Sequence, residues 1–96
     1  MKFFAVIFLA TISYIGDEER TENLYSYQLQ FGSYEECIHF YNNNTANLLN
    51  GLLEHGKEKY GDIQIEYLSC AEVEITPTLD VPNVIGQKPI YKRGNR

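Results

Sequence analysis

The chain has 96 residues, of which 44% are hydrophobic and 22% charged, a composition typical of a folded globular protein rather than a disordered chain. This length allows one domain at most, and a domain this small gains from a covalent bond or a partner that adds to its core. No apolar run reaches the roughly 18 residues expected of a membrane-spanning helix.

The net charge of −5 is unevenly distributed along the chain. Residues 1–82 carry thirteen acidic and four basic residues, a net charge of −9, whereas residues 83–96 carry four basic residues and no acidic one. Because an acidic surface repels the phosphate backbone, we do not expect nucleic acid as a partner. The basic residues near the end should be solvated or fold back on the acidic body; alternatively they form part of an interaction surface. They are Lys88, Lys92, Arg93 and Arg96.

The first segment, MKFFAVIFLATIS, has two interpretations. One lysine, an apolar stretch and a small-residue cleavage site fit a signal peptide of residues 1–13, which would leave an exported domain after cleavage. The aromatic and β-branched side chains of the same segment favour a β-strand that is buried on both faces. We favour the strand, because without it two strands and one helix would make only a thin core.

A second strand is expected over residues 24–31, where apolar and polar residues alternate from Tyr25 to Phe31. The polar, acid-rich residues 16–23 should form the connection between the first two strands. The pair of strands therefore predicts a hairpin with a longer loop than usual.

A helix should follow, since Ser33 and Glu36 have the spacing of a capping box. Apolar residues then recur at helical spacing, and Gly56 suits the position just after a helix end. We therefore expect a helix from about Tyr34 to His55, weakened by its asparagine run and Gly51.

A third strand is expected over residues 62–70, with Ile63, Ile65 and Tyr67 on one face. Beyond it, prolines interrupt every regular pattern. The sequence thus predicts one small α+β domain over residues 1–75, followed by an extended tail, residues 76–96, with a basic end.

The fold expected from these elements is a three-stranded sheet with strand order 2-1-3 and one helix on one face. A right-handed crossover through the helix makes the third strand parallel to the second. Since a single helix covers a single face, we expect the other face to be covered by the tail or by a second copy of the chain. Val81, Val84, Ile85 and Ile90 are the tail residues suited to this.

Cys37 and Cys70 are expected to lie near each other and to be able to form one disulfide. Cys37 belongs to the first turn of the helix, and Cys70 ends a strand that returns to that point. Strict alternation from Ile63 would point Cys70 away from the helix, so a β-bulge near Leu68 is needed. In a reducing compartment the two cysteines would be buried thiols.

No arrangement of residues predicts catalysis, a metal site or a cofactor. Cys37 and His39 are two apart on a helix and point in different directions, which makes a poor nucleophile–base pair. His55 would lie roughly 27 Å from Cys37 along the helix, too far for a shared metal ion. The glycines are isolated and form no phosphate-binding loop.

Three tyrosines, Tyr25, Tyr27 and Tyr67, either complete the core or form an aromatic surface for a protein partner. The chemistry therefore favours a small non-enzymatic accessory or interaction protein, acting on an unidentified partner or on a second copy. The alternative is the exported domain held by one disulfide.

Four residues, Phe31, Ser33, Cys37 and Phe40, form the pattern F-x-S-x-x-x-C-x-x-F before the leucine-bearing helix. Together with the opening strand and the second cysteine, this pattern resembles small uncharacterised proteins of tailed phages of marine bacteria. The resemblance covers residues 1–72 and excludes the tail. It implies a phage-encoded protein, for which the cytoplasm of an infected host is preferred over export, and it assigns no role to any residue.

Overall fold

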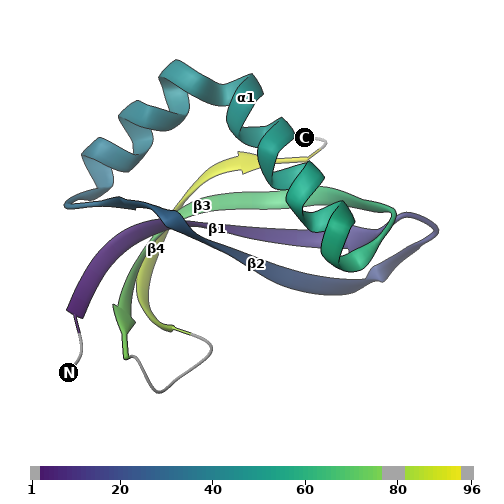
Figure 1. Ribbon diagram of the computed structural model, residues 1–96, viewed down its shortest axis with the longest axis horizontal. Coiled ribbons are helices and arrows are strands. Elements are labelled where there is room, and N and C mark those ends of the chain that lie inside the picture. Colours follow the sequence, from purple (N-terminus) through teal and green to yellow (C-terminus); the bar gives the residue numbers. More distant parts are fainter. Residues whose placement is uncertain (1–2, 77–81, 94–96) are drawn as a thin grey trace.

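The computed structural model describes residues 3–76 and 82–93, and this part of the chain folds as an α+β domain of four strands and one helix (Figure 1). The elements are β1 (Phe3–Tyr14), β2 (Asp17–Phe31), α1 (Tyr34–Tyr60), β3 (Ile63–Ile75) and β4 (Asn83–Lys92). The strands form one sheet in the order β2-β1-β3-β4. Neighbouring strands are antiparallel, and α1 crosses one face of the sheet.

The apolar segment near the start of the chain is a central strand, as predicted. β1 pairs with β2 on one side and with β3 on the other, so β2 and β3 run parallel to each other. Alternate residues face α1, including Phe8 and Ile12, while Ile7 and Leu9 face the opposite side, and all four are buried. A strand with two buried faces explains why this segment reads as a continuous apolar run.

Two segments that were not predicted as strands are strands in the structure. Residues 17–23, expected as a loop, are the first half of β2, and they form a hairpin with β1 through a tight turn at Gly16, where φ is +93°. Residues 83–92, expected within an extended tail, form β4 and make the sheet four-stranded rather than three-stranded. An edge strand tolerates Pro89, because half of its backbone N–H groups make no bond to the sheet. The alternation along β4 is also broken, because Ile85 and Ile90 have no partner residue on β3.

The helix begins where the sequence predicts and ends at Tyr60, five residues after the predicted end. The Ser33 hydroxyl accepts a hydrogen bond from the Glu36 backbone N–H at 3.2 Å, and the Glu36 carboxylate accepts one from the Gly32 N–H at 3.1 Å. The expected end at His55 and Gly56 is wrong. The cap is Gly61, whose φ is +91° and whose N–H donates to the Lys57 carbonyl at 2.9 Å.

Gly56 has a packing role instead. It is buried, and a Cβ atom at this position would lie 2.6 Å from Cδ1 of Ile63 on β3. Ile63 is itself 1% exposed, so its side chain has little room to move aside. The absence of a side chain at Gly56 therefore lets α1 approach the sheet closely.

We expect Gly56→Ala to destabilise the protein by about 1–3 kcal/mol through overpacking. The matched control is Gly51→Ala on the same helix, where a Cβ would have no neighbour within 4 Å. That change should stabilise the protein by about 0.5–1 kcal/mol, because alanine favours the helix. Urea unfolding of the two variants gives the free energies, and equal shifts of the same sign would contradict the close packing at Gly56.

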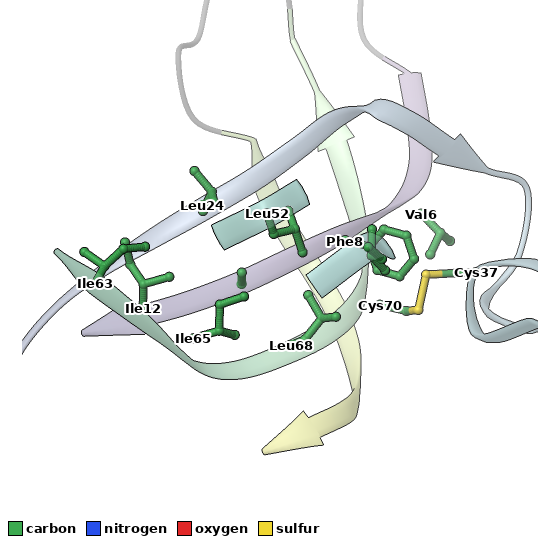
Figure 2. Close-up of a cluster of buried hydrophobic side chains, with 12 residues drawn as sticks. Val6, Phe8, Ile12, Leu24, Cys37, Leu52, Ile63, Ile65, Leu68 and Cys70 are labelled. Carbon is green, nitrogen blue, oxygen red and sulfur yellow. A yellow bond between two sulfur atoms is a disulfide. The ribbon is translucent and has the colours of Figure 1, made fainter. Parts of the chain in front are cut away.

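The main core lies between α1 and the sheet (Figure 2). Phe8 is its largest fully buried side chain and packs edge-on to Phe31, with 5.5 Å between ring centroids. Beside it, Cys37 and Cys70 form a disulfide with a Cα–Cα distance of 6.2 Å, which confirms that the two cysteines lie near each other.

A β-bulge re-aims the second half of β3, as the cysteine pair required. The pairing with β1 shifts between Thr11 and Ile12 and leaves Glu66 without a β1 partner. Ile65 before the bulge and Cys70 after it therefore both face α1, although residues five positions apart in a regular strand lie on opposite faces. The expectation that Tyr67 shares the face of Ile65 is wrong, because the bulge turns Tyr67 outward, where it is 47% exposed.

The face of the sheet opposite α1, here called the open face, buries a second cluster of Ile7, Leu9, Ala71 and Val73. The strands curve along their length (Figure 1), and the four side chains form one buried cluster on this face. The described part of the expected tail does not lie over this face. It extends the sheet beside β3, and its Val84 packs on the cluster. Ile90 packs on the α1 side, Ile85 is exposed, and Val81 lies outside the described residues.

Candidate functional site

A groove of about 580 Å³ separates α1 from β2. Residues 25–29 form the β2 wall, and Phe40, Leu48 and Leu52 supply most of the apolar surface on the helix side. The helix also contributes small and polar positions, which are Asn44, Asn47, Gly51 and His55. Ligand sites of proteins are commonly concave, largely apolar and of about 300–1,000 Å³, so this α1–β2 groove is the candidate site.

A kink in α1 shapes the helix wall of the groove. Asn44 leaves helical geometry, with φ −137° and ψ 26°, and its side-chain amide donates to the Phe40 carbonyl at 3.0 Å. The Thr45 hydroxyl donates to the Tyr41 carbonyl at 2.6 Å. Such side-chain bonds to the preceding turn bend helices, and the two halves of α1 diverge visibly in Figure 1.

An irregularity in β2 shapes the other wall. Phe31 pairs with Val6 and Ser26 pairs with Phe8, so four residues of β2 stand opposite the single β1 residue between them. The Gln30 side chain donates to the Tyr27 carbonyl at 3.0 Å within this bulge. β2 is also an edge of the sheet, since β1 is its only neighbour among the described strands. The groove therefore runs beside a strand edge that departs from regular pairing.

The structure divides the three tyrosines of the predicted interaction surface. Tyr25 and Tyr27 both belong to the groove lining, and their rings stack with centroids 6.1 Å apart; Tyr25 also packs on the open-face cluster. Tyr67 lies on β3 and does not line the groove. Its ring instead lies 5.8 Å from the ammonium group of Lys92.

The described basic residues of the predicted surface, Lys88, Lys92 and Arg93, lie on or directly after β4 and contact aromatic rings or carboxylates. Lys88 lies over the Tyr34 ring at 5.0 Å. Arg93 pairs with Glu18 at 3.1 Å and with Glu66 at 3.2 Å. Arg96 lies outside the described residues. Arg93, at the end of the described residues, therefore pairs with acidic residues of the body, as one of the alternatives predicted from the charge distribution.

Glu66, the residue at the β3 bulge, is the centre of a polar cluster. Its carboxylate accepts hydrogen bonds from the fully buried Ser13 hydroxyl at 2.5 Å and from the Gln64 amide at 3.3 Å. The hydrogen bond from Ser13 is the largest of the contributions that hold the pKa of Glu66 below its ordinary value. Arg93 and Gln64 lower this pKa further, while partial burial opposes the shift. A carboxylate with a lowered pKa is a poor general base.

The lowered pKa of Glu66 predicts a loss of stability in acid. The folded state holds the carboxylate deprotonated, so its stabilisation is complete above the unfolded pKa of about 4.3 and is lost as the pH falls through the folded value. We therefore expect the unfolding free energy of the wild type to fall more between pH 5 and pH 3 than that of Glu66→Gln. Urea unfolding across this range tests it, and parallel pH profiles would contradict the prediction.

Most of the groove was not foreseen from the sequence. Leu48 and Leu52 belong to the apolar residues that recur at helical spacing, and both are buried, which explains them as core residues and gives no separate sign of a groove. Gly51 was noted only as a weakness of the helix. Gly51 was the one sequence feature that indicated the groove, since a glycine in the middle of a helix is costly and is usually retained for packing or binding.

The described residues include no group of three His, Cys, Asp or Glu side chains that could hold a metal ion. Within the same residues, no helix has both the length and the apolar character to cross a membrane. The chain matches no protein-family model, no curated protein and no solved structure.

Proposed function

We propose that this chain is a small non-enzymatic interaction protein that binds its partner in the α1–β2 groove. The observation that carries the proposal is the largely apolar groove beside an edge strand. An apolar surface between two secondary structure elements is stabilised by a ligand that removes it from water.

The chemistry of the groove favours binding over catalysis. Its side chains are apolar, hydroxyl or amide groups with one histidine, and no carboxylate or thiol lines it. His55 thus has no acidic partner among the lining residues to orient it as a general base.

The proposal that the protein is phage-encoded, and acts in the cytoplasm of an infected host, rests on the sequence resemblance. The disulfide favours the alternative of an exported domain, because disulfides persist in oxidising compartments. The position of β1 opposes cleavage after residue 13, since β1 lies between β2 and β3. The intact mass of the protein, purified from its native host, separates the two proposals.

Site-specific photo-crosslinking tests the groove as the binding site. A benzophenone amino acid replaces His55, which lines the groove, or Ala46, which is exposed on the same helix outside it. In a bacterial lysate, we expect protein adducts from position 55 that are absent from position 46. The same adducts from both positions, or none from position 55, would contradict the proposal.

A further inference from the structure

We infer that the α1–β2 groove takes an extended, positively charged peptide segment of a partner protein, which adds as a strand to the edge of β2 and lies close to the helix backbone at Gly51. This inference rests on the proposed function and names the class of partner for the same site.

The edge of β2 provides the first reason. An exposed edge strand presents backbone N–H and C=O groups that pair with an added strand, and alternate side chains of the added strand then enter neighbouring pockets. The groove follows this edge at residues 25–29. Its helix wall extends from Phe40 to His55, roughly 22 Å at the helical rise per residue. That length suits about six or seven residues of extended peptide.

The opposite edge of the sheet is less suited to strand addition. β4 contains Pro89 and has two extra residues in its pairing with β3. Proline and bulges are devices that protect sheet edges from further pairing. β2 also departs from regular pairing, at residues 27–30, but it contains no proline, and this difference favours its edge for an incoming strand.

Gly51 provides the second reason. A glycine in a helix interior costs about 1 kcal/mol relative to alanine. Packing within the chain explains Gly56, whose Cβ would collide with Ile63, but it does not explain Gly51, where a Cβ would meet nothing within 4 Å. Since Gly51 lines the groove, a side chain there would take up space in it. Close approach of a ligand to the helix backbone accounts for the glycine.

Charge provides the third reason and selects the peptide. Along the sheet, β2 carries Asp17, Glu18, Glu19 and Glu22 with one arginine, whereas the charged residues of β4 are both lysines. On α1, Glu54 and Glu58 are exposed one turn from groove residues, and the nearby Lys59 lies over the Tyr60 ring. Lys57 and Lys59 balance Glu54 and Glu58 near the end of α1, so the acidic excess beside the groove comes from the first half of β2, in a chain whose residues 1–82 carry a net charge of −9. Such a field attracts cationic segments and repels acidic ones.

Selection from a random library of seven-residue peptides displayed on their own messenger RNA tests the inference. The full chain, with its disulfide intact, is the bait, and the most enriched peptides are synthesised as probes. We expect apolar residues at alternate positions together with lysine or arginine. Titration should show Gly51→Leu weakening these peptides at least tenfold, while Ala46→Leu, which adds the same side chain outside the groove, leaves their affinity unchanged.

Gly51→Leu is expected to stay folded, because its Cβ has open space and leucine favours a helix; its thermal unfolding checks this directly. Hydrogen exchange should show that the bound peptide protects amides within residues 25–29 of β2. No enrichment by the wild type over Gly51→Leu, or peptides that bind both equally, would overturn the inference.

Two outcomes separate the inference from the proposed function. Peptides that require Gly51 but leave the β2 amides unprotected would exclude strand addition and leave the groove as a binding site. Enriched peptides that are acidic would exclude the cationic partner. If selection fails but photo-crosslinking at position 55 succeeds, the partner binds the groove without presenting a cationic extended segment. Failure of both experiments would overturn the proposed function as well.

Discussion

A chain that lacks residues 1–13 is expected to be unfolded. Among the described strands, β1 is the one that pairs with both β2 and β3, and without it these two strands lose their shared partner. The deletion also removes Ile7, Phe8 and Ile12, each fully buried and each worth about 1.5–3 kcal/mol of transfer free energy. Their combined loss is comparable with the whole stability of a typical domain, about 5–15 kcal/mol.

Far-UV circular dichroism and the spread of amide proton shifts measure this result. The matched control is a chain that lacks only residues 1 and 2, which should unfold cooperatively like the full chain because β1 is intact. A cooperative transition in the shorter chain would contradict the central role of β1. It would also favour the exported alternative, in which residues 1–13 are removed.

Elements specified by local sequence were predicted correctly. The apolar run of β1 and the capping box at Ser33 depend on residues adjacent in the chain. The alternation from Tyr25 to Phe31 correctly predicted a strand, but its single shared face was wrong, because the bulge at residues 27–30 places Tyr25 on the open face and Phe31 on the main core. The sheet order 2-1-3 followed from these elements and the handedness of the crossover, and β4 extends it to β2-β1-β3-β4. The cysteine pair then required a bulge in β3, which the structure shows at Glu66.

Elements specified by distant contacts were missed. The acidic residues at the start of β2 have low strand propensity, and they form a strand because the turn at Gly16 places them beside β1. β4 contains a proline and extra residues, so its strand character depends on β3. The groove depends on the Asn44 kink and the β2 bulge together. Neither feature produces a regular spacing of apolar residues, so the sequence pattern does not reveal them.

Reduction of the Cys37–Cys70 disulfide is expected to lower the free energy of unfolding by about 3–4 kcal/mol, the value that the chain-entropy model gives for a loop of this size. The two cysteines are 33 positions apart in the sequence. The loop that the disulfide closes contains α1 after its first turn and also the β3 bulge. Since a shift of 1 kcal/mol moves the melting temperature of a domain this size by about 4–8 °C, the reduced protein should melt roughly 15–25 °C lower.

Urea unfolding with and without a phosphine reductant measures the difference, and the double variant Cys37→Ala with Cys70→Ala is the control. The reductant should leave this variant unchanged, because it has no disulfide to break. Both cysteines are fully buried, so the variant should be less stable than the reduced wild type, in which the thiols still fill the core. A reduced wild type as stable as the oxidised form would contradict the prediction.

The stability left after reduction also bears on where the protein acts. If the reduced chain retains several kcal/mol at 37 °C, it can fold in a reducing cytoplasm with two buried thiols, as the proposal of a phage-encoded interaction protein requires. If it is largely unfolded, the groove is formed only where the disulfide persists, because the bond ties the first turn of α1 to β3. Peptide binding to the groove should then be lost on reduction, and the exported alternative would be favoured.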